Sequence, residues 1–227
     1  MTDEIAALAE RIGHQFKDVT LLRRALTHGS QALAQGEIGY ERLEFLGDRV
    51  LGLIISDILY HRFRAEEEGD LAVRLNALVR AETCATVARE LDMGAALRMT
   101  KGEEKAGARD RGSILADACE AVIAALYLDG GMPPARAFIE TWWGPKLEAM
   151  KAPPRDPKTI LQEWAQAQKK GLPHYNAVGR TGPDHAPEFE IELTVSGLLP
   201  VVATGSSKRM AEQAAAERML KREGISS

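Results

Sequence analysis

Two different patterns of hydrophobic and polar positions divide this chain of 227 residues. From the N-terminus to about residue 150, apolar residues recur three and four positions apart, which predicts α-helices. Beyond residue 157, short alternating stretches lie between two helical ones. In 188–195, Phe, Ile, Leu and Val occupy every second position, as in an antiparallel strand with one solvated face. The pattern therefore predicts a multidomain chain, an all-α domain followed by a smaller α+β domain.

The boundaries of the predicted elements follow from turn and capping residues. In the first domain we expect two helices within 2–35, further helices over 40–59, 71–91, 113–128 and 134–150, and a polar, glycine-rich loop over 99–112. Three prolines predict a linker at 151–156, which separates domains at 1–150 and 157–227. In the second domain we expect a helix near its start, strands over 175–180, 188–195 and 199–205, and a last helix over 208–221.

Several local features complete this prediction. The expected helix caps are Asp18 or Thr20, Ser113, Asp156 or Thr159, and Ser206-Ser207. Gly130-Gly131 is the expected end of the helix that begins near Ser113. The expected inward residues of the 134–150 helix are Phe138, Trp142 and Leu147.

Acidic residues occur inside the two most apolar of the predicted helices. Glu41, Glu44 and Asp48 fall on one face of the 40–59 helix, at ~100° per residue. Asp117 and Glu120 lie three positions apart in the 113–128 helix. Charges in an apolar setting persist only when they are paired or bind a metal, so these acids need positive partners.

Two interpretations of these acids remain open from the residues themselves. The acids are exposed or paired with arginines such as Arg42 and Arg49, or the two helices face each other and form an oxygen-rich nest. Hard oxygen ligands suit Mg²⁺ or Mn²⁺. Because acids occur on both helices, we favour the second interpretation.

Composition narrows the class of protein. Hydrophobic residues make up 45% and charged residues 27%, as in ordinary globular proteins, and no apolar run approaches the ~20 residues of a membrane span. The N-terminus, Met-Thr-Asp-Glu-Ile, lacks the features of a signal peptide. Cys84 and Cys119 lack metal-type spacing and are expected to be reduced core thiols. We therefore expect a cytoplasmic protein without membrane contact.

The two predicted domains differ in charge. The whole chain has a net charge of −4, but residues 1–150 carry 18 basic and 24 acidic residues, whereas 151–227 carry 11 and 9. Neither part has the strongly basic surface of a tight non-specific nucleic-acid binder. The second part is mildly basic and is therefore the better candidate for binding an anionic partner.

The acidic motifs also carry a family resemblance. Glu41-Arg-Leu-Glu-Phe-Leu-Gly-Asp48, followed by Asp117-Ala-Cys-Glu120, resembles bacterial ribonuclease III, whose members carry this octapeptide and a downstream Asp-x-x-Glu. The resemblance implies an endonuclease that hydrolyses double-stranded RNA with Mg²⁺, for which Mn²⁺ substitutes, and without an organic cofactor. It assigns metal binding to Glu44, Asp48, Asp117 and Glu120, directly or through water.

The same resemblance implies catalytic roles and products. It implies hydrolysis of the two-metal type, in which Asp48 and Glu120 are catalytic and Glu120 is indispensable. Glu41 is expected to support catalysis from outside the primary ligands, or to position RNA. The expected products carry 5′-phosphate and 3′-hydroxyl ends, and the implied substrates are precursors of ribosomal RNA and some messenger RNAs, with transfer RNA processing also expected.

Cutting both strands with one acid cluster per chain implies a symmetric homodimer. Phe45 lies on the acidic face and resembles the family residue that inserts into the partner subunit. The alternative for Phe45 is an ordinary core aromatic within its own chain.

The second domain resembles the double-stranded RNA-binding domain, in its α-β-β-β-α order and in three motifs. The motifs are Leu161-Gln162-Glu163, Gly182-Pro183-Asp184-His185 and Gly205-Ser-Ser-Lys-Arg-x-Ala-Glu212. A-form RNA is held through its minor-groove 2′-hydroxyls and its phosphates. The predicted RNA contacts are Gln162, Glu163, His185, Ser206, Lys208 and Arg209. Eukaryotic relatives often place a third basic residue where this chain has Glu212, which suggests modest affinity.

The roles of His28 and of the basic residues in the 99–112 loop are less clearly defined by the sequence. His28, in Thr27-His28-Gly29-Ser30 at the expected end of the second helix, is interpreted as a hydrogen-bonded structural residue. The basic residues of the 99–112 loop either meet RNA phosphates, as in the family, or belong to a solvated loop; they are Lys101, Lys105, Arg109 and Arg111.

Two other functions compete with the nuclease interpretation. One is an RNA-binding regulator with an inactive nuclease fold, which the loss of any of the four metal-binding acids would favour. The other is a helical protein with a structural ion-pair cluster joined to an unrelated small domain.

Overall fold

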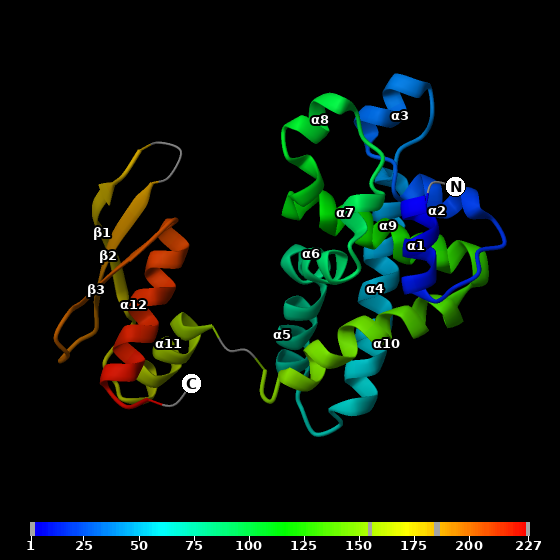
Figure 1. Cartoon of the computed structure of the whole chain (residues 1–227). Coiled ribbons are helices and arrows are strands. Elements are labelled where there is room, and N and C mark those ends of the chain that lie inside the picture. The colour runs from blue at the N-terminus through cyan, green and yellow to red at the C-terminus, as the bar shows by residue number, and fades with distance from the viewer. Residues whose placement is uncertain (1–2, 154–155, 184–186, 226–227) are drawn as a thin grey trace. The chain divides into compact units, whose positions relative to one another are not determined.

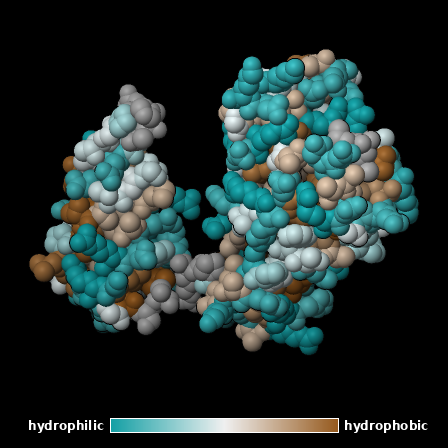
Figure 2. All heavy atoms as spheres, viewed as in Figure 1, coloured by the Kyte–Doolittle hydropathy of each residue, from teal (hydrophilic) through white to brown (hydrophobic). Residues whose placement is uncertain are grey.

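A computed structural model describes residues 3–153, 156–183 and 187–225 of the chain. The chain divides into two compact units, residues 1–154 and 155–227 (Figure 1). None of the helices described is both long and apolar enough to cross a lipid bilayer. On the face shown in Figure 2, hydrophilic residues predominate on each unit.

The first unit is all-helical. Its elements are α1 (Asp3–Ile12), α2 (Val19–Ala25), α3 (Gly29–Gln35), α4 (Glu41–Arg62), α5 (Glu68–Val79), α6 (Ala81–Glu90), α7 (Met93–Ala96), α8 (Lys101–Lys105), the 3₁₀ helix η1 (Ala108–Asp110), α9 (Gly112–Gly130) and α10 (Met132–Ala149).

Helix α9 forms the centre of this unit. Most of its residues are buried, and it contacts α2, α4, α6 and α10, among which Figure 1 shows it. Its most extensive packing is with α4, whose Leu51, Ile54 and Ile55 belong to the same core. Helix α9 is apolar on nearly all sides, as a central helix requires, so its predicted burial is confirmed. Helix α4 is buried on one side only, because Phe45, Leu53 and Tyr60 are exposed, so its predicted burial is confirmed in part.

The structure corrects the prediction of one helix over 71–91. Helices α5 and α6 are separated at Arg80, whose backbone is extended (φ −65°, ψ 153°). The break frees carbonyls at the end of α5, and side chains satisfy three of them. The Thr83 hydroxyl donates to Ala77 O (2.8 Å), Trp143 Nε1 to Leu78 O (2.8 Å) and Cys84 Sγ to Val79 O (3.8 Å).

Other predicted boundaries in the first unit also differ. A third short helix, α3, follows Thr27-His28 within 2–35, because the His28 side chain accepts a hydrogen bond from Ser30 N (3.2 Å) and caps it. Helix α9 begins at Gly112 without a side-chain cap, so Ser113 is not the predicted cap. The predicted caps Asp18 and Asp156, and the end of α9 at Gly130-Gly131, are confirmed.

The inward face of α10 is partly as predicted. Phe138 and Leu147 are buried, but the fully buried tryptophan is Trp143, whereas Trp142 is only partly covered by the core. Trp143 can be buried because its indole N–H donates a hydrogen bond to the Leu78 carbonyl inside the core.

The second unit packs two helices on one three-stranded sheet. Its elements are α11 (Pro157–Ala167), β1 (His174–Thr181), β2 (Glu188–Thr194), β3 (Val201–Gly205) and α12 (Lys208–Arg222). The strands are antiparallel in the order β1-β2-β3, and Leu193 of β2 pairs with Tyr175 and Val201. Leu161, Leu193 and Met219 form part of its core, so the predicted α-β-β-β-α order is confirmed.

Candidate active site and RNA-binding surface

The four predicted metal-binding acids come from the most closely packed pair of helices in the first unit. Glu44 and Asp48 lie one turn apart on α4, and Asp117 and Glu120 lie about one turn apart on α9. Gly47 makes the approach possible, because a Cβ at this position would overlap the backbone carbonyl of Glu120. A glycine between the two acids of α4 thus brings the acids of α9 close.

Burial and repulsion by neighbouring acids raise the pKa values of Glu44, Asp117 and Glu120. For Glu120, burial is the main cause, and the charges of Asp48, Glu44 and Asp117 add to it, so that its pKa rises to about 7. Burial also raises the pKa of Glu44, together with the charges of Asp117, Glu41 and Asp48. Raised pKa values mean that the cluster lacks compensating positive charge.

Asp117 has a different neighbourhood from the other acids. Burial raises its pKa, and the charge of Glu41 adds to the rise, while His28 and the hydroxyl of Tyr40 act in the opposite direction. The Tyr40 side chain is buried, and burial and the neighbouring Asp117 raise the pKa of its hydroxyl. The His28 ring meets the Tyr40 ring edge-on at 5.8 Å between centroids.

Arginine compensates only part of this cluster. Arg49 forms an ion pair with Asp48, and its guanidinium also lies 4.5 Å from the centre of the Phe45 ring. Among the residues that the structure describes, Glu44, Asp117 and Glu120 make no ion pair, and neither does Arg42. Pairing with arginine therefore explains Asp48 but not the rest of the cluster.

The chemistry of this donor set fits a hard divalent cation, since four carboxylates offer oxygen ligands and an unbalanced negative charge. Their side chains do not already form a coordination shell: in the described residues, no group of three or more His, Cys, Asp or Glu side chains is close enough to hold a metal. Repulsion between like charges and the ion pair of Asp48 with Arg49 both favour this separation.

Glu41 lies in the first turn of α4, where its charge raises the pKa values of Glu44 and Asp117. Its carboxylate occupies the space beside Gly29 and Gly39, where a Cβ on either glycine would collide with it. Gly29 is the first residue of α3, where the helix dipole favours negative charge. That Glu41 positions RNA or supports catalysis from outside the primary ligands stays a prediction.

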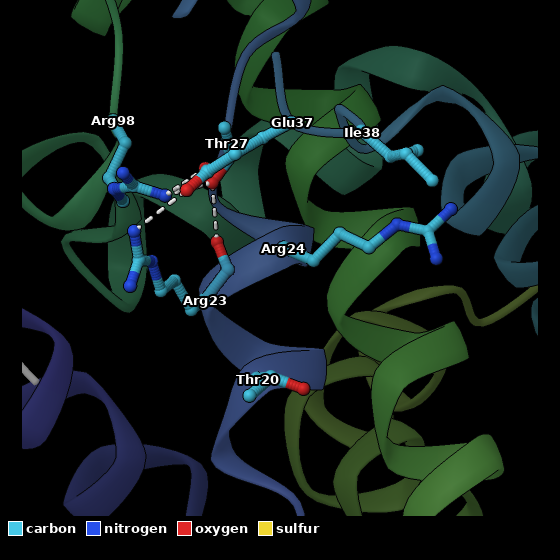
Figure 3. A pocket seen from close by; sticks show the side chains of 7 residues that line it. All are labelled: Thr20, Arg23, Arg24, Thr27, Glu37, Ile38 and Arg98. Atoms are coloured by element: carbon cyan, nitrogen blue, oxygen red, sulfur yellow. Dashed lines mark hydrogen bonds and ion pairs between the residues drawn. The ribbon is translucent and has the colours of Figure 1, made fainter. Parts of the chain in front are cut away.

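A pocket lies beside the start of α4 (Figure 3). It is lined by Thr20, Arg23, Arg24, Thr27, Glu37, Ile38 and Arg98. Glu37 accepts from Arg23 (3.0 Å) and Arg98 (3.2 Å), and Arg98 also donates to Thr27 Oγ1 (2.8 Å). These bonds connect the segment between α3 and α4 to α2. Arg23 and Arg98 therefore stabilise the fold at this pocket.

The 99–112 segment is more structured than the predicted loop. It contains α8, which Thr100 caps, and η1. Arg109 donates to Leu97 O (2.7 Å), Gly94 O (2.8 Å) and Glu104 (2.9 Å), so its guanidinium serves the fold. Lys101, Lys105 and Arg111 are exposed, and a contact with RNA remains a prediction for them.

Sequence reasoning missed two residues that touch the acid cluster. One is Tyr40, beside Asp117. The other is Cys84, whose thiol interacts with the Glu120 carboxylate. Both cysteines are free and buried, as predicted, and burial raises their pKa values. The signal for Tyr40 was its place directly before Glu41, but nothing in the sequence connects Cys84 with Glu120.

Phe45 is not a core residue of its own chain. Its side chain is 64% exposed on the surface of α4, which excludes the alternative interpretation. Leu53 and Tyr60 are also exposed along α4. An apolar surface next to the acid cluster is the kind of surface that a second protein covers.

The predicted RNA contacts lie on the surface of the second unit. Gln162 and Glu163 are exposed on α11, and Lys208 and Arg209 are exposed in the first turn of α12. Ser207, rather than Ser206, caps α12 by accepting a hydrogen bond from Met210 N (3.2 Å), and Ser206 is exposed beside it. His185 lies outside the described residues.

The fold and these sites define a class of protein. A helical unit with a carboxylate cluster, joined to an α-β-β-β-α unit with a basic helix N-terminus, is a nuclease with a double-stranded RNA-binding domain. The comparison with known families agrees: residues 18–147 match the family described as "Ribonuclease-III-like", and residues 157–223 match "Double-stranded RNA binding motif".

Similar proteins extend this comparison over nearly the whole chain. The Ribonuclease 3 of Caulobacter vibrioides is 51% identical over 222 residues, 97% of this chain and 96% of that protein. The Ribonuclease 3 of Azorhizobium caulinodans is 50% identical over 226 residues, 99% of this chain and 96% of that protein. The solved nuclease domain of ribonuclease III from Campylobacter jejuni has a TM-score of 0.58 and 38% identity, and covers 62% of this chain and 99% of that one. The chain belongs to the ribonuclease III family and is an endoribonuclease of double-stranded RNA.

Proposed function

We propose that this chain hydrolyses the phosphodiester bonds of double-stranded RNA with Mg²⁺ held by Glu44, Asp48, Asp117 and Glu120, and that Mn²⁺ substitutes for Mg²⁺. The observation that carries this proposal is the uncompensated charge of the cluster: burial and three neighbouring carboxylates raise the pKa of Glu120 to about 7. A partly buried acid cluster without enough basic partners favours the binding of a cation from outside.

The bound metal would supply a Lewis acid that offsets the negative charge developing on the scissile phosphate in a two-metal type of hydrolysis. Asp48 on α4 and Glu120 on α9 lie close enough for the charge of Asp48 to raise the pKa of Glu120, and together they would hold the cation that binds the reacting phosphate. By the family resemblance, Glu120 is the residue whose carboxylate the hydrolysis needs most. Products leave with 5′-phosphate and 3′-hydroxyl ends.

Two surrounding residues keep the acids in place. The Tyr40 hydroxyl interacts with Asp117, and burial prevents the Tyr40 ring from turning away. Glu41, beside Gly29 and Gly39, places a further carboxylate at the approach to the cluster and acts in catalysis by positioning rather than as a primary ligand.

RNA is held by the second unit. Gln162 and Glu163 on α11 contact the minor groove, His185 contacts a second minor groove, and Ser206, Lys208 and Arg209 contact phosphates at the N-terminus of α12. Support comes from the exposure of Lys208 and Arg209 where backbone N–H groups and the helix dipole favour an anion.

The active species is a homodimer. The exposed Phe45 ring on α4 inserts into the partner subunit, and two acid clusters then cut the two strands. The nuclease domain of Campylobacter jejuni ribonuclease III, which this chain resembles, has structural flexibility in a region involved in dimer formation. A Phe45→Glu variant is expected to elute as a monomer in size-exclusion chromatography with light scattering. Leu33→Glu, which changes an even more exposed apolar residue on α3, is expected to stay dimeric.

The enzyme acts in the cytoplasm on precursors of ribosomal RNA, on some messenger RNAs and on transfer RNA precursors. These substrates rest on the family resemblance, since an RNA-binding unit of this kind reads shape more than sequence.

Cleavage of a long RNA duplex tests the proposal. We expect cutting with Mg²⁺ or Mn²⁺, none with a chelator, and none by a Glu120→Gln variant that still binds the duplex. Glu148→Gln, an exposed acid of α10, is the matched control and keeps full activity. A wild-type chain that binds the duplex but never cuts it with either metal would leave only the RNA-binding function.

A further inference from the structure

Two side-chain bridges connect the start of α11 with α12 in the second unit. Lys158 Nζ lies 2.5 Å from Glu212 Oε2, and Gln213 Nε2 donates to Asp156 Oδ2 (3.0 Å). The other oxygen of Asp156 caps α11 by accepting from Lys158 N (2.8 Å). The ammonium of Lys158 is therefore held between the two helices that carry the candidate RNA contacts.

The ion pair of Lys158 and Glu212 lies on the same helix faces as the candidate RNA contacts of α11 and α12. Lys158 lies one turn before Gln162 on α11, and Glu212 lies one turn after Lys208 on α12. Residues four positions apart are neighbours on a helix surface. The side chains of Lys158 and Glu212 are 34% and 26% exposed, so both charges reach the surface of the unit.

The cations of this surface are not equally available to an anion. Among the described residues, Lys208 and Arg209 are exposed and make no ion pair. Lys158, by contrast, already has a carboxylate partner, and its ammonium lies 4.6 Å from the centre of the Tyr175 ring. A phosphate that approaches the Lys158 ammonium therefore meets the negative charge of Glu212 beside it.

We propose that Glu212 limits the affinity of this chain for double-stranded RNA by occupying Lys158, which becomes a phosphate contact when Glu212 is neutralised. Without Glu212, the Tyr175 ring keeps the ammonium near the surface, beside Gln162. Lys158 is thus a latent RNA contact, and Glu212 is the residue that determines affinity. The inference rests on the proposed RNA-binding surface of α11 and α12.

A double-mutant cycle tests the inference in the full chain. We would measure the Kd for a defined RNA duplex at several salt concentrations, with chelator present so that no RNA is cut. Glu212→Gln is expected to tighten binding by about 3–10-fold and to steepen the slope of log K against log salt by about one unit, as one added phosphate contact does. Lys158→Met alone is expected to change Kd by less than about twofold, and in the Glu212→Gln background to abolish the gain.

Controls separate this effect from its alternatives. Glu217→Gln removes the same charge from an exposed position of α12 and is expected to leave Kd unchanged. Melting curves of each variant verify folding. The inference is overturned if Glu212→Gln leaves Kd unchanged or weakens binding, if Lys158→Met alone lowers the salt slope, or if the double variant keeps the gain.

A further variant distinguishes failure of the inference from failure of the proposed surface. Lys208→Ala with Arg209→Ala is expected to weaken binding at least tenfold. If this variant binds like the wild type, the surface is assigned wrongly and the inference falls with it. If the variant loses affinity while Glu212→Gln changes nothing, only the inference is wrong.

Discussion

Two carboxylates on α9, nine residues apart, have opposite environments. Asp129 accepts hydrogen bonds from Asp18 N (2.8 Å), Lys17 N (3.1 Å) and His14 Nε2 (2.8 Å), and its side chain is 1% exposed. Burial alone would raise its pKa, but these donors together lower it. Glu120 has three acids as neighbours, and its pKa rises to about 7.

The difference separates an acid that stabilises the fold from an acid of the candidate active site. At Asp129 the chain supplies every partner, so the charged carboxylate stabilises the native state. At Glu120 the chain supplies more negative charge, and the folded protein is left with an electrostatic cost that an external cation can relieve.

The largest expected effect is on catalysis. Glu120→Gln should lower the rate of duplex cleavage by a factor on the order of 10²–10⁴ while Kd for the duplex stays within about twofold. Asp129→Asn should retain most of the cleavage rate per folded molecule. Single-turnover kinetics with Mg²⁺ measures both, and equal losses in the two variants would remove the distinction between the two ends of α9.

The contact between α4 and α9 should be sensitive to a single methyl group. Gly47→Ala places a Cβ against the Glu120 carbonyl, so we expect a loss of about 2–3 kcal/mol in the free energy of unfolding, together with reduced cleavage. Gly69→Ala in α5 is the control, since a Cβ there meets nothing within 4 Å and should raise stability by up to about 1 kcal/mol. Urea unfolding measures both values, and a stable, active Gly47→Ala variant would disprove the close approach.

Removing the carboxylate of Asp129 should destabilise the fold without touching the active site. Asp129→Ala leaves the N–H groups of Lys17 and Asp18 without their acceptor, and we expect a loss of about 1–3 kcal/mol. Because the folded pKa is lowered, this contribution is present above the unfolded pKa and disappears as pH falls through the folded pKa. Urea unfolding of wild type and variant at pH 7 and at pH 2–3 should show a difference at the first pH only.

Glu120→Gln should raise the free energy of unfolding, whereas Asp129→Ala should lower it. The folded pKa of Glu120 is raised from 4.5 to about 7, so the charged form destabilises the metal-free chain above pH 7, and the effect vanishes below about pH 4.5. We expect the variant to be more stable than the wild type by about 1–2 kcal/mol at pH 8 and equal to it at pH 4.5. Chemical unfolding with chelator present measures this, and a variant less stable at pH 8 would contradict it.

The central helices were predictable because their pattern is independent of other elements. The sequence of α9 is apolar on nearly all sides, and such a helix is buried wherever it lies in a fold, whereas the apolar positions of α4 also include an exposed side. The alternation of Ile191 and Leu193 likewise identified β2. The acid cluster could be proposed because four acids lie within these apolar stretches.

The remaining features depend on partners far away in the sequence. The break at Arg80 requires Trp143 to bond the Leu78 carbonyl, 65 residues away. The 99–112 segment is ordered by bonds from Arg109 to Gly94 and Leu97. Glu41 lies beside Gly29 only because α3 places Gly29 there. The sequence did not predict α3, because its seven residues show no apolar periodicity.

The most direct test of the acid cluster is the response of thermal unfolding to Mg²⁺ at pH 7.5. If the cluster is a cation site, Mg²⁺ in the millimolar range should raise the Tm of the wild-type chain by a few degrees in a saturable way. The shift should be much smaller for Glu120→Gln and unchanged for the control Glu148→Gln. An equal shift in all three proteins, or none in the wild type at any concentration, would contradict the assignment of Glu44, Asp48, Asp117 and Glu120 as the metal site.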